Sequence, residues 1–361
     1  MSSPRVLSIQ SHMVSGYCGN KAATFPLQLL GFDVDVMNTV NFSNHTGYPS
    51  WTGERATGEH LLQLYKGLQT NGLVEYTHIL TGYIGSAQNL SAVTEIIAQL
   101  RTHGDPFFVL DPVMGDNGQL YVHSDVIPLY RKLMKYANAI TPNQFEAEIL
   151  ADKKITDVKS CLEVLDILHT TGVENVVITS VSLLPSDVAA HAAHWHPHHH
   201  HHHKDEETTE PSMYCVCSSK GDQDETKKVF AIGFPTYDGY FTGTGDLFSA
   251  LLVAWLDEAL VEAQPPAKAG SAYGLGSKEM HTPLVRACVK VVATMKAVVL
   301  RSYLAQMGIT SGGQLDRTQA SSAAVIKRCE LRLIQSKKDI EQPDEQGVEA
   351  VELSWIEKGK H

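Results

Sequence analysis

The segment at residues 239–256 combines a glycine-rich turn, an acidic residue and a strongly apolar helical stretch. Its turn consists of Gly243, Thr244, Gly245 and Asp246. The backbone N–H groups of a helix's first turn have no partner inside the helix, and the helix dipole adds partial positive charge there. They can therefore bind an anion such as a transferring phosphoryl group, with Asp246 beside it as a base. The same four residues could equally serve as a structural helix cap.

Phosphoryl transfer to a small alcohol needs a site for the alcohol, a base, cations that screen the nucleotide phosphates, and exclusion of water. The chain contains no Gly-x-x-x-x-Gly-Lys-Ser/Thr sequence, so a phosphate-binding loop of that kind is excluded. The turn at 243–246 therefore predicts a kinase that binds phosphate with a different loop.

Polar residues also follow two apolar runs near the N-terminus. Ser11 and His12 come directly after the first run, and His45 and Thr46 follow the second beside two aromatic residues. Hydroxyl and imidazole groups among aromatic rings suit an aromatic ligand that carries polar substituents. Taken alone, Ser11 could instead cap a helix, and His45 could be a structural loop histidine.

Acidic, hydroxyl and amide side chains follow the later apolar runs. They are Asp111, Asp116, Thr141, Asn143, Glu146, Glu148, Thr179 and Ser180. Oxygen ligands of these types suit the hard cations Mg²⁺ and K⁺ and not zinc. Glu146 and Glu148 begin a predicted helix, where acids can also act as simple partners of the helix dipole.

The elements that must position these residues alternate along the chain. Strands are predicted at 6–10, 34–40, 76–81, 107–111, 139–141 and 176–180, and helices at 19–30, 54–70, 88–102, 124–136, 143–151 and 158–171. Continuous apolar strands separated by helices are typical of a parallel sheet covered on both faces. Ligands of such sheets bind beyond the carboxyl ends of the strands, where many of the polar residues above fall.

The alternating pattern changes after residue 180. Residues 186–210 include six consecutive histidines and are expected to form a disordered surface insertion. Such a run binds Ni²⁺ or Zn²⁺ without a defined geometry, so it predicts adventitious binding or no role. A hairpin is predicted from 213–218 and 228–234, a surface loop at 262–282 and a long helix at 283–306. We assign 1–342 to one domain and 343–361 to a loosely held acidic tail.

Composition limits the class of protein. The 361 residues carry a net charge of −11, which argues against a nucleic-acid-binding protein but not against a nucleotide in a local pocket. The six cysteines complete no zinc-ligand pattern and are expected to be free thiols. The N-terminus leads straight into a strand, and no apolar run could span a bilayer. We therefore expect a soluble, cytoplasmic protein with no membrane partner.

Several segments resemble the pyridoxal kinases, a family of the ribokinase-like superfamily. They are RVLSIQSH at 5–12, AATFPLQLLGF at 22–32, FSNHTGY at 42–48, LTGY at 80–83, DPVMGD at 111–116, ITPNQFEAE at 140–148, VVITS at 176–180, GTGDLF at 243–248 and ELRLIQSKKDI at 330–340. GTGD marks only the superfamily, whereas SIQSH and FSNHTGY point to pyridoxal kinases. The resemblance covers residues 5–342 apart from insertions. It implies an α/β fold, the ribokinase-like three-layer α/β/α sandwich with a central, mostly parallel sheet.

The resemblance also implies a role for each group of polar residues. Asp246 would be the base that activates the 5′-hydroxymethyl group of pyridoxal, and Gly243, Thr244 and Gly245 would bind the γ-phosphoryl group. The substrate would also contact Ser11, His45, Thr46 and Tyr83. ATP would contact Asp116, Tyr121, Asn143, Glu146, Thr179, Ser180, Tyr237, Asp238, Gly239 and Thr244. Mg²⁺ would be held at Asp116 and Glu146, and K⁺ or Na⁺ at Asp111, Thr141, Glu146 and Thr179.

The family is usually homodimeric, and pyridoxine and pyridoxamine would be further substrates. A carboxylate at a helix N-terminus is expected to be ionised, which makes Asp246 a weak base. A loose phosphoryl-transfer transition state asks little of its base, so a weak one suffices. Two alternatives stay open: a related kinase of hydroxymethylpyrimidine or a sugar, and a non-catalytic scaffold that binds metal through the histidine run.

Overall fold

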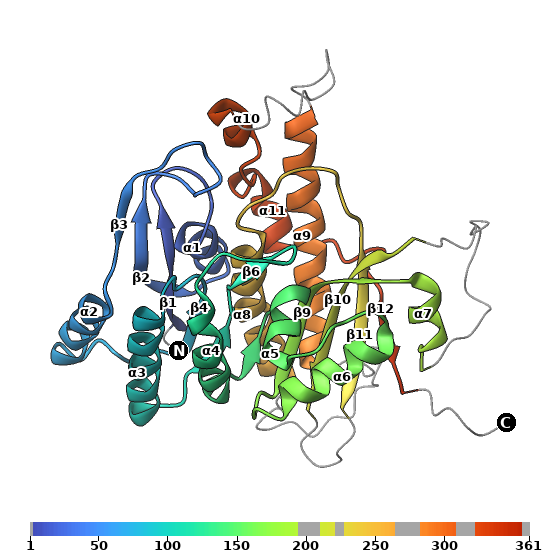
Figure 1. Cartoon of the computed structure of the whole chain (residues 1–361), viewed down its shortest axis with the longest axis horizontal. Coiled ribbons are helices and arrows are strands. Elements are labelled where there is room, and N and C mark those ends of the chain that lie inside the picture. Colours follow the sequence, from blue (N-terminus) through green and yellow to red (C-terminus); the bar gives the residue numbers. More distant parts are fainter. Residues whose placement is uncertain (1–2, 194–209, 221–226, 264–281, 308–321, 356–361) are drawn as a thin grey trace, which may run out of the picture.

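A ten-stranded sheet runs through the protein (Figure 1). The computed structural model describes residues 3–193, 210–220, 227–263, 282–307 and 322–355. The strands are β1 (Arg5–Met13), β2 (Asp33–Phe42), β3 (Gly53–Arg55), β4 (His78–Thr81), β5 (Phe107–Leu110), β8 (Ala139–Ile140), β9 (Asn175–Leu183), β10 (Ser212–Ser219), β11 (Lys228–Phe234) and β12 (Ala350–Leu353). Their order across the sheet is β12-β11-β10-β9-β8-β5-β4-β1-β2-β3. A separate antiparallel pair consists of β6 (Gly115–Asp116) and β7 (Gln119–Leu120).

The centre of the sheet is parallel. Strands β2, β1, β4, β5, β8 and β9 pair in parallel with their neighbours in that order. The strands at its middle are apolar on both faces: Phe108, Val109 and Leu110 of β5 and Val176, Val177 and Ile178 of β9 are fully buried. Strands of this kind need helices on both sides of the sheet. All six parallel strands coincide with predicted ones, which confirms the mostly parallel sheet.

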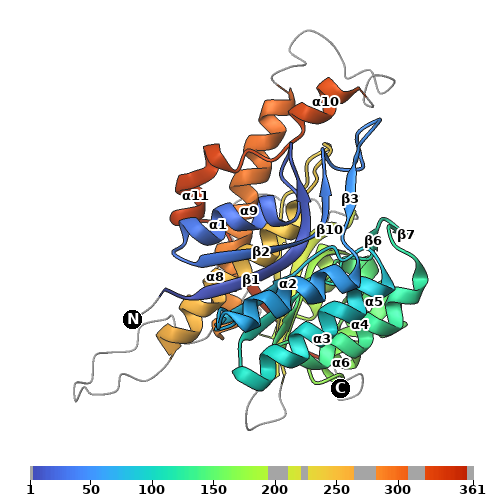
Figure 2. The ribbon, with the colours of Figure 1, turned by 90° about the vertical axis from the view of Figure 1, so that its left-hand side faces the viewer.

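Helices cover both faces of the sheet. They are α1 (Asn20–Leu29), α2 (Gly58–Thr70), α3 (Ala87–His103), α4 (Ile127–Leu133), α5 (Gln144–Ala151), α6 (Val158–His169), α7 (Pro185–Ala190), α8 (Thr244–Ala263), α9 (Pro283–Met307), α10 (Ala323–Arg328) and α11 (Lys337–Glu341). Figure 2 shows α1, α8, α9 and α11 on one face and α2 to α6 on the other. The predicted three-layer α/β/α sandwich is therefore confirmed.

Local sequence explains where several helices begin. The side-chain oxygens of Thr57 and Ser86 accept the free N–H groups at the starts of α2 and α3. Residues 54–70 were expected to be one helix, but Glu54 and Arg55 belong to β3, and the Thr57 cap delays the helix to Gly58. The expected helix at 124–136 is α4 flanked by the 3₁₀ turns η1 (Ser124–Val126) and η2 (Met134–Tyr136).

Both edges of the sheet are antiparallel: β3 pairs with β2 at one edge, and β10, β11 and β12 form the other. The predicted hairpin is confirmed: β10 pairs with β11 and also with β9. Strand β12 then pairs with β11, and Leu353 is buried against the core. The expectation that residues 343–361 form a loosely held tail is thus wrong over Ala350–Leu353. Four residues suffice there because the unpaired edge of β11 supplies backbone partners.

The two expected surface loops are only partly described. Residues 186–190 of the histidine-rich insertion lie in α7, because Pro185 starts a helix there, and Ala192 forms a bridge with Leu353. Residues 194–209, and 264–281 of the second loop, lie outside the described residues. Among the described helices, none is both long and apolar enough to cross a membrane.

Candidate active site

The glycine-rich turn lies at the N-terminus of α8, as the sequence predicts. Gly243 has a φ of +83°, and a Cβ atom built there would lie 2.0 Å from the backbone oxygen of Tyr17. A side chain is therefore excluded at this position by both conformation and space. Helix α8 begins at Thr244, so the N–H groups of its first turn point out of the helix end.

Asp246 lies in that first turn and contacts a second loop. The backbone N–H of Gly19 donates to Asp246 Oδ2 at 2.7 Å. Burial raises the pKa of Asp246, and this hydrogen bond opposes the rise. The sequence predicts an ordinary carboxylate at a helix terminus, but desolvation outweighs the favourable N–H groups here. Asp246 is thus a stronger base than expected.

A second carboxylate lies beside the turn. Asp111 is buried at the end of β5, and a Cβ built at Gly245 would lie 3.7 Å from Asp111 Oδ2. Burial raises the pKa of Asp111 well above its ordinary value, and the charges of Glu146 and Asp246 raise it further. The hydroxyl of Ser249 lies 3.1 Å from Asp111 Oδ2. We name Asp111, Glu146 and Asp246 the acid cluster.

Glu146 is the third member of the acid cluster and is held by backbone N–H groups. Its Oε1 accepts from Met114 at 2.8 Å and from Gly115 at 3.3 Å, and its Oε2 accepts from Asn143 at 3.0 Å. Asn143 and Glu146 also form the capping box of α5. Burial raises the pKa of Glu146 to about 7 although the three N–H groups lower it. Asp116 lies on the solvent side of this loop and is exposed.

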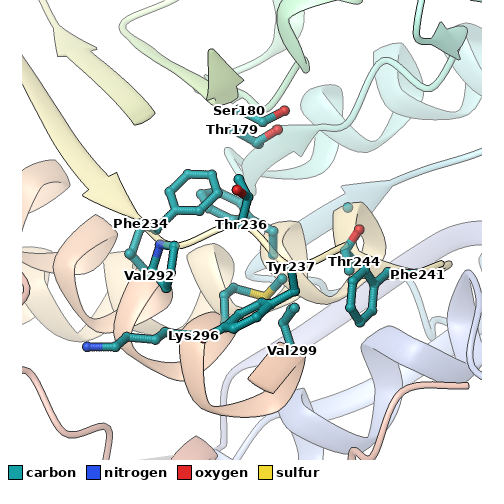
Figure 3. A pocket seen from close by; sticks show the side chains of 14 residues that line it. Thr179, Ser180, Phe234, Thr236, Tyr237, Phe241, Thr244, Val292, Lys296 and Val299 are labelled. Carbon is teal, nitrogen blue, oxygen red and sulfur yellow. The ribbon is translucent and has the colours of Figure 1, made fainter. Parts of the chain in front are cut away.

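A pocket of about 270 Å³ lies against the turn, with Thr244 and Gly245 in its lining (Figure 3). Four of the predicted ATP contacts line it, Thr179, Ser180, Tyr237 and Thr244. Its walls are apolar and come mainly from β11, α8 and α9: Phe234, Phe241, Phe248, Val292, Met295 and Val299. Apolar walls with hydroxyl groups at one side suit an aromatic base attached to polar groups. Sequence reasoning gave these apolar residues no role.

The other predicted ATP contacts lie outside the lining of this pocket. Asn143 and Glu146 lie at the start of α5, and Asp116 on β6. Tyr121 follows β7 and is 61% exposed, with its N–H donating to the Met114 backbone oxygen. Asp238 and Gly239 are exposed beyond Tyr237, whose ring stacks on Tyr303. The predicted nucleotide residues therefore fall into three sets: four line the pocket, Asp116, Tyr121, Asp238 and Gly239 are exposed, and Asn143 and the buried Glu146 lie at the start of α5.

The predicted substrate contacts lie at the ends of β1, β2 and β4. β1 continues to Met13, so Ser11 lies within the strand, at a register shift, and not after it as expected. Ser11 does not cap α1, because Gly19 is the N-cap and no side-chain bond caps it. A Cβ at Gly19 would lie 2.4 Å from Ser11 Oγ, so Ser11 lies beside the residue that contacts Asp246.

The remaining predicted ring contacts differ in exposure. His45 is buried, and its ring lies 4.6 Å from that of Tyr48 and 6.3 Å from that of Tyr240. Thr46 is exposed, and Tyr83 is half-buried after β4. Histidine, threonine and aromatic groups are thus available at the same edge of the sheet as Asp246.

Two cation sites were expected from the sequence. Thr141 Oγ1 lies 2.8 Å from Ser249 Oγ, which in turn contacts Asp111, so these three residues meet. The Thr179 N–H donates to the backbone oxygen of Pro142, next to Thr141 in the chain. Within the described residues, no three histidine, cysteine or acidic side chains are arranged to hold a metal ion. Hydroxyl or backbone oxygens, or the nucleotide itself, would have to complete either site.

Sequence reasoning missed two buried polar residues of the site. Ser249 of α8 joins Thr141 to Asp111, and Glu330 contacts the loops that follow β1 and β2. Ser249 could have been found from its place three residues after Asp246, nearly one helical turn on. Glu330 gave no local signal, because its partners are far away in sequence.

Comparisons with known proteins agree with this architecture. The chain is 38% identical to pyridoxal kinase from Ovis aries over 346 residues, which are 94% of this chain and 96% of that protein. It is 36% identical to pyridoxal kinase from Homo sapiens, with 94% and 96% covered. Pyridoxal kinase from Leishmania donovani in complex with ADP and pyridoxamine is 31% identical, with a TM-score of 0.71 and coverage of 97% of this chain and 98% of that one. The family model for phosphomethylpyrimidine kinase matches residues 72–212. The chain has a ribokinase-like fold and belongs to the pyridoxal kinase family.

Proposed function

We propose that this kinase transfers the γ-phosphoryl group of ATP to the 5′-hydroxymethyl group of pyridoxal, and also of pyridoxine and pyridoxamine. One observation gives the proposal its main support. Asp246 and the turn at Gly243 lie between two regions, a pocket lined by Thr179 and Thr244 and a set of ring-binding candidates around Ser11. A base and an anion-binding turn between nucleotide and alcohol are what in-line phosphoryl transfer needs.

In the proposed reaction the hydroxyl oxygen attacks the γ-phosphorus, the bond to the bridging oxygen of ADP breaks, and the hydroxyl proton passes to Asp246. The raised pKa of Asp246 favours acceptance of that proton. The free N–H groups at the start of α8, next to Gly243, face the charge that develops on the phosphoryl oxygens. These groups are fixed before the reaction, so they need no rearrangement as charge builds up.

The remaining roles follow the two regions. We assign the substrate ring to Ser11, His45, Thr46 and Tyr83, which lie in or after the carboxyl ends of β1, β2 and β4. We assign ATP to Thr179, Ser180, Tyr237 and Thr244 in the pocket and to the exposed Asp238 and Gly239 that follow Tyr237. We also assign it to the exposed Asp116 and Tyr121 and to Asn143 and Glu146 at the start of α5. Tyr121, at 61% exposure, is available to cover a bound nucleotide.

The acid cluster fits a requirement for cations. Buried carboxylates close to one another are unfavourable unless a positive charge joins them. We propose Mg²⁺ at Asp116 and Glu146, where the carboxylate of Glu146 keeps lone pairs beyond its three N–H bonds. We propose K⁺ or Na⁺ at Asp111, Thr141, Glu146 and Thr179, with oxygen ligands that suit these hard ions. Bound there, the cations would neutralise charge on the phosphates during transfer.

A second function class within the superfamily is phosphorylation of a hydroxymethylpyrimidine. The match to phosphomethylpyrimidine kinase favours it over a sugar kinase, but that match ends at residue 212 and begins at residue 72. It therefore includes neither the loops with Ser11 and His45 nor the turn with Asp246. The pyridoxal kinase relatives cover these segments as well, so pyridoxal is the better-supported substrate.

The test is formation of pyridoxal 5′-phosphate from pyridoxal and ATP, with Mg²⁺ and K⁺ present. We compare the wild type, Asp246→Asn and Asp257→Asn, a matched change further along α8. Asp246→Asn should lower kcat at least about a hundredfold, since it removes the base without changing its shape. Asp257→Asn should keep wild-type turnover. A wild type that phosphorylates hydroxymethylpyrimidine and ignores pyridoxal would overturn the substrate assignment.

The metal-binding scaffold is tested in the same assay with a deletion of 191–203. Full turnover of the deletion variant would rule out a function that depends on the histidine run. We further propose that the enzyme is a cytoplasmic homodimer, as the resemblance implies. Light scattering of the purified full chain would show the mass of two chains, and a monomeric mass would contradict this.

A further inference from the structure

The carboxylate of Glu330 is buried beneath the ring-binding candidates. Glu330 follows α10, and its side chain is 3% exposed. The N–H of Tyr17 donates to its Oε2 at 2.9 Å, and the hydroxyl of Tyr48 donates to its Oε1 at 3.0 Å. His45 Nε2 lies 3.6 Å from the same Oε1. Among the described residues, no lysine or arginine pairs with Glu330, so these donors from two loops take the place of a cation.

The backbone around Glu330 is anchored in the core. Leu331 and Leu333 are 1% and 0% exposed, and the N–H of Arg332 donates to Ser302 Oγ on α9 at 3.0 Å. Buried leucines on both sides of a hydrogen-bonded backbone leave little room for movement. The carboxylate of Glu330 is therefore a fixed point against which the two loops are held.

The first of these loops runs from β1 to α1 and reaches the reacting groups. Tyr17, bound to Glu330, is two residues before Gly19, whose N–H donates to Asp246. The backbone oxygen of Tyr17 also lies against Gly243 of the anion-binding turn. A shift of Tyr17 would thus move both the partner of the base and the wall of the turn.

Gly16 shows how closely this loop approaches Glu330. Its φ is +99°, and a Cβ built there would lie 2.3 Å from Glu330 Oε1. Lys327, three residues before Glu330, also bonds to this loop, because its Nζ donates to Ser15 Oγ at 3.1 Å. The loop is therefore shaped to receive the Glu330 carboxylate.

The second loop follows β2 and carries His45. The N–H of Gly47 donates to His45 Nδ1 at 3.2 Å, so in the neutral ring Nε2 carries the proton and faces Glu330. Burial lowers the pKa of His45, and the charge of Glu330 opposes this. The other titratable groups around the pair are Tyr48 and Tyr240 beside His45, and Cys18 and Cys329 beside Glu330.

We propose that Glu330 is a positioning residue for phosphoryl transfer, which holds the ring-binding loop through His45 and Tyr48 and the Asp246 contact through Tyr17. The proposal rests on the proposed function, because it assigns the ring to His45 and the base to Asp246. It makes the segment around Glu330 part of the active site, with Glu330 acting through Tyr17, His45 and Tyr48. One carboxylate thereby couples the place of the alcohol to the place of the base.

The test compares the wild type, Glu330→Gln and Glu341→Gln in the pyridoxal assay, together with thermal unfolding of each. Glu330→Gln keeps the shape and loses the charge, and Glu341→Gln is the matched change at an exposed glutamate of the same segment. Glu330→Gln should lower kcat at least about tenfold and raise KM for pyridoxal about fivefold, with KM for ATP within about twofold of wild type. Glu341→Gln should match the wild type throughout.

The pH profile separates positioning from a merely structural role. The neutral form of His45 is the one proposed to bind the ring, so its protonation should contribute to the acid limb of kcat/KM for pyridoxal beside that of Asp246. Loss of the Glu330 charge should lower the pKa of His45 and move this contribution to lower pH. A variant with unchanged kcat, unchanged KM for pyridoxal and an unmoved acid limb would overturn the proposal. So would a loss of kcat that merely follows a loss of folded protein, with both KM values unchanged.

A second variant keeps the test decisive if Glu330→Gln does not fold. Tyr48→Phe removes one donor to Glu330 and should raise KM for pyridoxal about threefold with KM for ATP unchanged. If Tyr48→Phe then behaved like the wild type, the role of Glu330 would be overturned. The wild type itself tests the proposed function separately, since absence of pyridoxal 5′-phosphate would overturn that function whatever the variants do.

Discussion

The single carboxylate of Glu330 and the three carboxylates of the acid cluster lie near the carboxyl edge of the sheet, and their surroundings differ. Glu330 is met by donors from the protein, the N–H of Tyr17 and the hydroxyl of Tyr48. In the acid cluster the pKa of Asp111 is raised by burial and then by the charges of Glu146 and Asp246. The protein thus satisfies one carboxylate by itself and leaves the other group in need of positive charge.

This difference separates two tasks. A carboxylate that positions loops must have the same partners before and after turnover, so the protein supplies them. Carboxylates proposed to handle ATP must leave room for cations, and Asp111 and Asp246 each accept one hydrogen bond, from Ser249 and from Gly19. Glu146 is the exception, because three backbone N–H groups bind it and burial still raises its pKa.

Removal of cations should have the largest effect. If the acid cluster depends on them, treatment with EDTA in a buffer free of K⁺ and Na⁺ should lower kcat at least about a hundredfold. Mg²⁺ with K⁺ should restore it, whereas Mg²⁺ with tetramethylammonium chloride at equal ionic strength should restore only part. Turnover that survives without any metal ion would remove the contrast between the acid cluster and Glu330.

Cations should also raise the thermal stability of the protein, and the rise should be larger at higher pH. The folded-state pKa of Glu146, about 7, lies above its ordinary value of 4.5. Its contribution to stability is therefore complete below about pH 4.5 and is lost as pH rises through about 7. A bound cation favours the ionised form, so K⁺ and Mg²⁺ should raise Tm by about 5 °C at pH 8 and by less than half of that at pH 6.

Differential scanning calorimetry of the wild type at both pH values measures this effect, with tetramethylammonium chloride as the control salt. An equal rise in Tm at pH 6 and pH 8 would mean that the cations bind elsewhere. A larger rise at pH 6 would contradict the direction of the Glu146 pKa.

Most of the fold could be predicted from the sequence, because the parallel strands are continuous apolar runs with local helix signals between them. Thr57, Ser86 and Asn143 fix helix starts through bonds to residues three positions away. Strand β12 escaped prediction because a four-residue strand in an acidic segment carries little signal of its own. Its formation depends on the edge of β11, which is remote in sequence.

The site too has features that depend on neighbouring residues in the sequence and features that depend on distant ones. The turn at Gly243 and the proposed base Asp246 are contiguous, so their chemistry could be proposed from the sequence alone. The raised pKa of Asp246 could not, because it results from burial by elements distant in sequence. Glu330 lies in a segment that resembles the family, but its burial against Tyr17 and Tyr48 appears only in three dimensions.

The smallest predicted effects are changes in the free energy of unfolding, which should have opposite signs for a variant of the acid cluster and for a variant beside Glu330. Asp111→Asn removes a buried charge from the acid cluster and keeps an acceptor for Ser249, so in cation-free buffer it should stabilise the fold by about 1 kcal/mol. Tyr48→Phe removes a donor from Glu330, so it should destabilise the fold by about 1–2 kcal/mol. Urea unfolding of each variant measures both values.

Tyr76→Phe is the matched control for the second change. The Tyr76 hydroxyl donates to Asp35 at 2.8 Å, but Asp35 also binds Arg5 at 2.8 Å and is 43% exposed. Water and Arg5 can replace the lost hydroxyl there, so the loss should be at most about 0.5 kcal/mol. If Tyr48→Phe cost no more than Tyr76→Phe, Glu330 would not depend on its buried donors. If Asp111→Asn were destabilising without cations, the protein itself would stabilise the charges of the acid cluster. The acid cluster would then not differ from Glu330 in its need for cations.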